Sequence, residues 1–105
     1  MNSFILFIDT SHSDKLMVNL KINKKEIEYE ESFDFRKSQG VLPLIDKVIK
    51  ENGLKFSDIS AIKVNTGPGS FTGLRVGVCI ANTLGNILQI PINNQRVGIL
   101  AEPTY

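Results

Sequence analysis

A glycine-rich segment, residues 66–73 (TGPGSFTG), has the composition of an anion-binding turn. It lies between an expected strand and an expected helix, where backbone amides and the helix N-terminus attract a phosphate group. The segment is no P-loop, because Leu74 and Arg75 follow where that motif places a lysine, and the acidic ribose partner of a dinucleotide fingerprint is missing. The spacing alone is therefore a weak indication of phosphate binding.

Asp9, at the end of the first apolar run, could add a carboxylate to this turn. The candidate phosphate or nucleotide site then comprises Asp9, Thr10, Ser11, Gly67, Gly69, Ser70 and Thr72. The alternative is structural: the two glycines supply unusual backbone angles for a sharp turn, and Ser70 or Thr72 caps the following helix. Residue types alone favour the structural interpretation.

The other reactive side chains form no catalytic or metal-binding set. A two-metal nuclease of the RNase H type needs several convergent carboxylates, but the second strand end reads Asn65-Thr66. His12 has no second histidine or cysteine near it, so we expect a polar loop residue. Cys79 lies on an apolar helix face and is expected in the core. We expect no catalytic residue and no metal ligand.

A stripe of small residues marks the second expected helix. Its members fall four apart and share one helix face: Gly73, Gly77, Ala81 and Gly85. Each mid-helix glycine costs about 1 kcal/mol relative to alanine, so a close contact must compensate. Because the other side of this helix has enough large apolar residues to face a sheet, we expect the stripe to contact a partner helix. The alternative is that it packs on the protein's own sheet.

An α/β fold is expected to position these groups. Short apolar or alternating runs predict strands at 4–8, 16–22, 25–31 and 61–65, and Ile92 begins an expected last strand. Helical spacing predicts a helix at 38–52, with Pro43 in its first turn or at a kink and Gly53 as its C-terminal stop, and a second helix at 71–88. The order βββαβα(β) predicts a mixed sheet with two main helices. We expect one lobe over 1–98 and a tail at 99–105.

The first helix has an apolar arc wider than one sheet contact requires. Together with the small-residue stripe of the second helix, it is the expected partner interface. Its members on the first helix are Val41, Leu44, Ile45 and Val48.

Length and charge exclude several classes of function. The 105 residues suffice for one domain without an interdomain cleft, and 12 basic against 11 acidic residues leave a net charge of +1. Autonomous nucleic-acid binding is therefore not expected. A single cysteine, no signal-peptide pattern and no long apolar run indicate a reduced, cytoplasmic protein without a membrane anchor.

The sequence resembles the TsaB (YeaZ) family in three motifs. They are Ile8-Asp9-Thr10-Ser11, Leu42-Pro43-Leu44-Ile45 and, most specifically, residues 67–77 (GPGSFTGLRVG). The resemblance covers residues 4–98 and implies an actin-like/RNase H-like (ASKHA) lobe. The chain departs from the family by Lys37-Ser38, where members usually carry His-Ser, and we expect no second actin-like lobe within its 105 residues.

The resemblance also implies a function, the formation of N6-threonylcarbamoyladenosine (t6A) at position 37 of tRNAs that read ANN codons. Family members are noncatalytic partners of a similar TsaD/Kae1-like subunit, which holds the metal and transfers the threonylcarbamoyl group, and the pair recruits a TsaE-like ATPase. We therefore expect this chain to dock and activate a TsaD-like enzyme through its two helices. We expect ATP, ADP and metal only in that complex, tRNA contact only through it, and a homodimer when the chain is alone.

Two alternatives remain from other classes of protein. One is a nucleotide-binding, actin-like ATPase that uses the candidate phosphate site, and the other is a self-associating structural domain.

Overall fold

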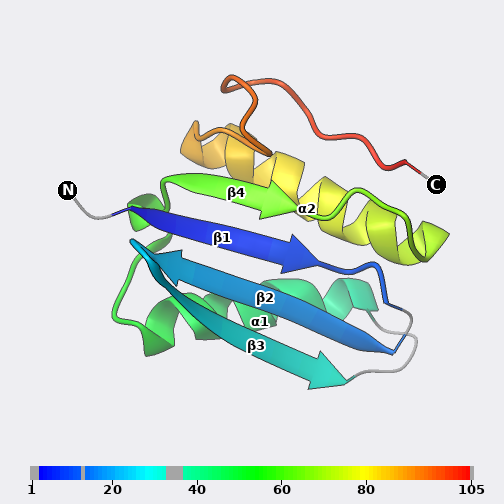
Figure 1. Ribbon diagram of the computed structural model, residues 1–105, viewed down its shortest axis with the longest axis horizontal. Coiled ribbons are helices and arrows are strands. Elements are labelled where there is room, and N and C mark those ends of the chain that lie inside the picture. The colour runs from blue at the N-terminus through cyan, green and yellow to red at the C-terminus, as the bar shows by residue number, and fades with distance from the viewer. Residues whose placement is uncertain (1–2, 13, 33–36, 105) are drawn as a thin grey trace.

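The computed structural model describes residues 3–12, 14–32 and 37–104, except the side chains of 37–39 and 71. Four strands form one mixed sheet in the order β3-β2-β1-β4, shown in Figure 1. Within it, β1 (Phe4–Asp9) pairs antiparallel with β2 (Lys15–Ile22) and parallel with β4 (Ala61–Val64), and β2 pairs antiparallel with β3 (Lys25–Ser32).

The first three strands form an antiparallel meander. The turn between β2 and β3 has two residues, and Asn23 adopts a φ of 57° there, a left-handed conformation that asparagine tolerates better than most residues. The Asn23 side chain also accepts a hydrogen bond from the backbone amide of Ser3 (3.0 Å). The start of β1 is thereby tied to the β2–β3 turn.

Two helices lie on the same side of the sheet, behind the strands in Figure 1. Helix α1 (Lys37–Glu51) packs mainly on β2, and α2 (Phe71–Leu88) packs on β4 and β1. Pro43 lies inside α1 rather than in its first turn. A short 3-10 helix, η1 (Phe56–Asp58), precedes β4.

The end of α1 is set by Gly53, as the sequence predicts. Gly53 has a φ of 69°, its amide donates to Lys50 O (3.0 Å), and the Leu54 amide donates to Ile49 O (3.0 Å). These two bonds are those of a Schellman motif, which satisfies carbonyls that the helix end would leave free. The Asn52 side chain adds bonds to Val48 O and to the Tyr29 hydroxyl, joining the helix end to β3.

One face of the sheet and the facing sides of both helices form the core. Alternate strand residues point into it, among them Leu6, Ile8, Val18, Leu20 and Ile62, each at most 1% exposed. Because successive strand residues point to opposite faces, their neighbours in the sequence lie on the other face of the sheet.

The last predicted strand is reduced to a single bridge. Ile92 pairs parallel with Ile62 of β4, and Asn93 then turns with a φ of 52°. Its side chain bonds the backbone of Val64 in both directions (2.8 and 3.1 Å). This amide takes the place that a longer strand's backbone would occupy.

Candidate functional site

A polar cluster occupies the carboxyl ends of β1 and β4. Asp9 Oδ1 accepts hydrogen bonds from the Ser11 amide (2.9 Å), the Ser11 hydroxyl (2.6 Å) and Asn65 Nδ2 (3.2 Å). Its Oδ2 lies 3.9 Å from His12 Nε2. The parallel pairing of β1 with β4 brings these groups together, because both strands end at the same edge of the sheet.

The cluster stabilises the ionised form of Asp9. Burial alone raises the pKa of this carboxyl, but the hydrogen bonds from Ser11 and Asn65, with nearby His12, outweigh burial and hold the pKa below its ordinary value. His12 is half-exposed, as expected of a loop residue. In the sequence, Asn65 is notable only because it stands where a nuclease would carry a carboxylate. In the structure, its side-chain amide helps to hold Asp9 in place.

The glycine-rich loop fits closely against its own chain. Gly67 has a φ of 140°, and a Cβ there would collide with the backbone oxygen of Thr104. A Cβ on Gly69 would lie 2.6 Å from the Cβ of Ser11, whose carbonyl accepts a bond from the Ser70 amide (2.9 Å). These close approaches account for both glycines without a ligand.

Several polar groups of the loop already have partners. Gly67 N donates to Asn65 Oδ1 (3.0 Å), and Ser70 Oγ caps α2 by accepting from Gly73 N (3.3 Å). The expectation that Ser70 or Thr72 caps the helix is thus confirmed for Ser70. Thr72 is exposed, and the Thr10 hydroxyl donates to Gly73 O in the first turn of α2 (2.5 Å). The geometry gives this cluster a structural role, joining β1, β4 and the start of α2.

The small-residue stripe packs on its own lobe, so its assignment to a partner interface is wrong. Gly73, Gly77, Ala81 and Gly85 are all buried. A Cβ on Gly77 would collide with the hydroxyl oxygen of Thr10, and a Cβ on Gly85 would lie 2.5 Å from Ile92 Cδ1. The close contact that the glycines require is made with the end of β1 and with the segment after α2.

The prediction that four apolar residues of α1 contact a partner is also wrong. Val41, Leu44, Ile45 and Val48 are each at most 2% exposed, because this side of α1 faces the sheet and α2. The wide apolar arc serves two contacts within the lobe rather than one contact with a partner.

The opposite side of α2 is the apolar surface that remains open. We call it the outer α2 face; it comprises Val76, Cys79, Ile80, Thr83 and Ile87. Ile87 is 68% exposed, and Cys79 is exposed, not in the core as expected. Val76 and Ile80 are half-buried. On α1, Leu42 is exposed as well. The stripe side of α2 is therefore buried and Cys79 and Ile87 are open, the opposite of what the sequence predicts for them, although Val76 and Ile80 still pack partly against the core. The signal for the buried side was the need for glycine where two backbones approach closely.

Within residues 3–12, 14–32 and 37–104, no group of three or more histidine, cysteine or acidic residues could hold a metal ion. Nor does any helix in that part of the chain have the length and apolar character to cross a membrane.

Comparisons with known proteins agree with the motifs. Residues 35–94 match the sequence model of the family described as TsaD: tRNA N6-adenosine threonylcarbamoyltransferase. The whole chain is 34% identical, over 108 residues, to the tRNA threonylcarbamoyladenosine biosynthesis protein TsaB of Buchnera aphidicola subsp. Schizaphis graminum, and it covers 50% of that protein. It is also 43% identical over 51 residues, 49% of this chain and 14% of the relative, to a tRNA N6-adenosine threonylcarbamoyltransferase of Polynucleobacter asymbioticus.

The solved structure of YeaZ from Pseudomonas aeruginosa has the same fold over most of the chain. The TM-score is 0.80 at 30% identity, and the match covers 86% of this chain and 42% of YeaZ. The predicted resemblance to TsaB (YeaZ) and the predicted actin-like/RNase H-like lobe are therefore confirmed. The chain spans about half the length of the TsaB and YeaZ proteins that it matches.

Proposed function

Because the chain belongs to the family of the tRNA N6-adenosine threonylcarbamoyltransferase TsaD, we propose that it acts in t6A biosynthesis as a noncatalytic subunit that docks and activates a TsaD-like enzyme. The names of its TsaB relatives support the pathway. The observation that supports a docking role is the outer α2 face, where Ile87 is the most exposed large hydrophobic side chain of the described residues.

The outer α2 face has the chemistry of a docking surface rather than of a catalytic one. Its members are aliphatic side chains, one thiol and one hydroxyl, and the Thr83 hydroxyl already donates to Cys79 O (2.9 Å). Ile87 is an aliphatic anchor of the kind that can fill a pocket on a partner, and contacts at the centre of an interface commonly contribute 2 kcal/mol or more. The partner surface is therefore proposed to be apolar.

The remaining components belong to the complex in this proposal. Metal, ATP and ADP bind the TsaD-like and TsaE-like subunits, tRNA meets this chain only through the complex, and all of this takes place in the cytoplasm. The polar cluster at Asp9 supports the assignment, because its groups bond one another and close the loop. The isolated chain is then inert towards ATP and towards threonylcarbamoyl transfer.

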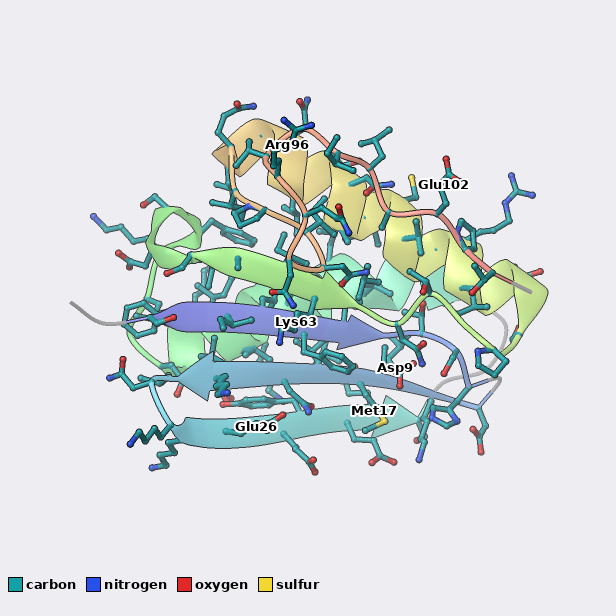
Figure 2. All side chains as sticks on the ribbon, turned by 45° about the horizontal axis from the view of Figure 1, so that its top comes forward. Asp9, Met17, Glu26, Lys63, Arg96 and Glu102 are labelled. Atoms are coloured by element: carbon teal, nitrogen blue, oxygen red, sulfur yellow. The ribbon has the colours of Figure 1, made fainter. Side chains whose placement is uncertain are left out.

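Co-purification with the TsaD homologue of the same organism tests the proposal. Ile87→Asp should abolish co-purification and leave the melting temperature within about 2 °C of the parent, because surface substitutions usually change stability by at most about 0.5 kcal/mol. The matched control is Lys63→Asp, an exposed position on the face of the sheet opposite the helices (Figure 2), which should bind normally. Binding by Ile87→Asp equal to that of the parent would contradict the proposed surface.

A further inference from the structure

The face of the sheet opposite the helices carries a row of side chains with different chemistry. The strand register aligns Lys63 on β4, Phe7 on β1, Asn19 on β2 and Glu28 on β3. We call these four residues the cross-sheet row. No helix of the described residues covers it, since both helices pack on the other side, and Figure 2 shows this side of the sheet with Lys63 labelled.

Asn19 brings a buried acceptor without a donor to the middle of the row. Asn19 is 7% exposed, and its Nδ2 donates to Glu26 Oε1 (3.1 Å), but no group of the described chain donates to its Oδ1. A buried acceptor in this state costs free energy until a donor reaches it. Because no helix of the described residues lies over this face, neighbouring side chains of the sheet screen the oxygen, and an incoming group can displace them.

Glu28, the direct cross-strand neighbour of Asn19, is a second acceptor without a partner. The acidic residues before and after it on the same face are engaged, because Glu26 accepts from Asn19 and Glu30 forms an ion pair with a lysine of β2 (3.8 Å). Glu28 is exposed and has no ion-pair partner among the described residues. Strands are about 4.8 Å apart, so Lys63 lies roughly 14 Å away and cannot reach it.

Phe7 determines which cation suits these two acceptors. It is half-buried and adjoins Asn19 on the side away from Glu28, so a group lying over Asn19 meets a ring on one side and a carboxylate on the other. A guanidinium is planar, stacks on aromatic rings and donates in its own plane to carboxylate and amide oxygens, whereas an ammonium is a compact, strongly hydrated charge. Lys63, beyond Phe7, repels a cation at the β4 edge and confines the site to β1, β2 and β3.

We propose that the cross-sheet row binds an arginine side chain of another protein. The guanidinium lies over Asn19, donates to Asn19 Oδ1 and to the Glu28 carboxylate, and stacks on Phe7. Half-buried Ile5 and Met17, in the two neighbouring rows, offer an apolar surface to the residues on either side of that arginine. The partner is therefore a segment with an arginine between aliphatic residues. None of these positions belongs to the outer α2 face, so this site and the surface proposed for the enzyme subunit are separate.

NMR titration of the isotope-labelled intact chain with the peptide acetyl-Leu-Arg-Leu-amide tests the proposal. We expect millimolar binding that shifts the side-chain amide signals of Asn19, because one side chain of the peptide makes most of the contact. The same peptide with citrulline in place of arginine has nearly the same shape but no charge. It should bind at least about tenfold more weakly, since hydrogen bonds between charged groups are the stronger ones.

Variants of the chain separate the two acceptors. Glu28→Gln should weaken peptide binding about tenfold, whereas Glu31→Gln, the same change on the other face of the same strand, should bind like the parent. Asn19→Leu should also lose binding but keep its melting temperature, because an apolar group then replaces an unpaired acceptor. Ile87→Asp should bind the peptide normally, so failure here and failure of the co-purification test are distinguishable.

Three results would overturn the proposal: equal affinity for the arginine and citrulline peptides, parent-like binding by Glu28→Gln, or peptide-induced shifts confined to signals outside the cross-sheet row. Shifts of the Asn19 signals that follow protein concentration without peptide would also overturn it, because a second copy of the chain would then be the occupant.

Discussion

Thr10 explains at the scale of single residues why α2 needs glycine where it does. Its side chain lies against Gly77 and donates to Gly73 O (2.5 Å), so the helix backbone and the end of β1 touch directly. The fold of the lobe itself therefore requires small residues on this side of α2. Substitution on the stripe is expected to act on folding first and on binding only as a consequence.

Gly77→Ala should lower the free energy of unfolding by about 1–3 kcal/mol, because the new Cβ meets Thr10 and overpacking costs that much. The better helix propensity of alanine, about 1 kcal/mol, offsets only part of it. Urea denaturation measures the change. The matched control is Thr83→Ala on the exposed side of the same helix, and a Gly77→Ala protein as stable as that control would show that the contact with Thr10 is not tight.

Asp9 should make stability depend on pH in the acid range. Its pKa in the folded chain lies below the ordinary value of 3.8, so its contribution is complete above that pH and is lost as the pH falls through the folded pKa. Asp9→Asn should therefore lose stability at neutral pH and show a smaller further loss between neutrality and acid than the parent. Melting curves across this range measure it; parallel pH profiles for the two proteins would contradict the assignment.

At the scale of elements, the segment after Ile92 holds the loop and α2 together. Figure 1 shows it returning alongside α2 toward the start of that helix. The Asn82 side chain donates to Ala101 O (3.0 Å) and accepts from Ala101 N (2.8 Å), and Thr104 N donates to Thr66 O (2.6 Å). An asparagine amide thus pairs with this segment much as a neighbouring strand would.

Asn82→Ala should release this segment from α2, because both bonds to Ala101 depend on the one side chain. Proteolysis near Arg96 should become faster while the melting temperature falls by no more than a few degrees, since a typical hydrogen bond contributes about 1 kcal/mol. Limited trypsin digestion followed by mass spectrometry measures the cleavage rate. Gln89→Ala, near the end of the same helix, is the control, and equal cleavage rates would contradict the role of Asn82.

At the scale of the whole molecule, the lobe presents two surfaces of different chemistry. The outer α2 face is mainly aliphatic and is proposed to meet an enzyme subunit, whereas the sheet face opposite the helices combines half-buried apolar side chains such as Phe7 with exposed charges such as Glu28 and Lys63. Ile87→Asp and Lys63→Asp therefore compare the two surfaces in one binding assay.

Local patterns in the sequence were enough to determine the strands, the helices and the family. The alternation in β2 and β3, the helical spacing in α1 and α2, and Gly53 as a helix stop depend on neighbouring residues, so they could be read without a fold. Asp9 and the glycine-rich loop could likewise be placed at one edge of the sheet, because both follow strands predicted to lie in that sheet.

Only the tertiary structure decided which side of each helix is buried and which groups meet. A small-residue stripe suits a partner helix and a nearby strand end equally well, and Thr10 and Ile92 occupy the stripe here through contacts that no local pattern encodes. The register of four strands likewise determines that Lys63 and Glu28 share a row but lie too far apart to pair. Such facts depend on residues distant in the chain, and their physical cause is the close packing of backbone against backbone.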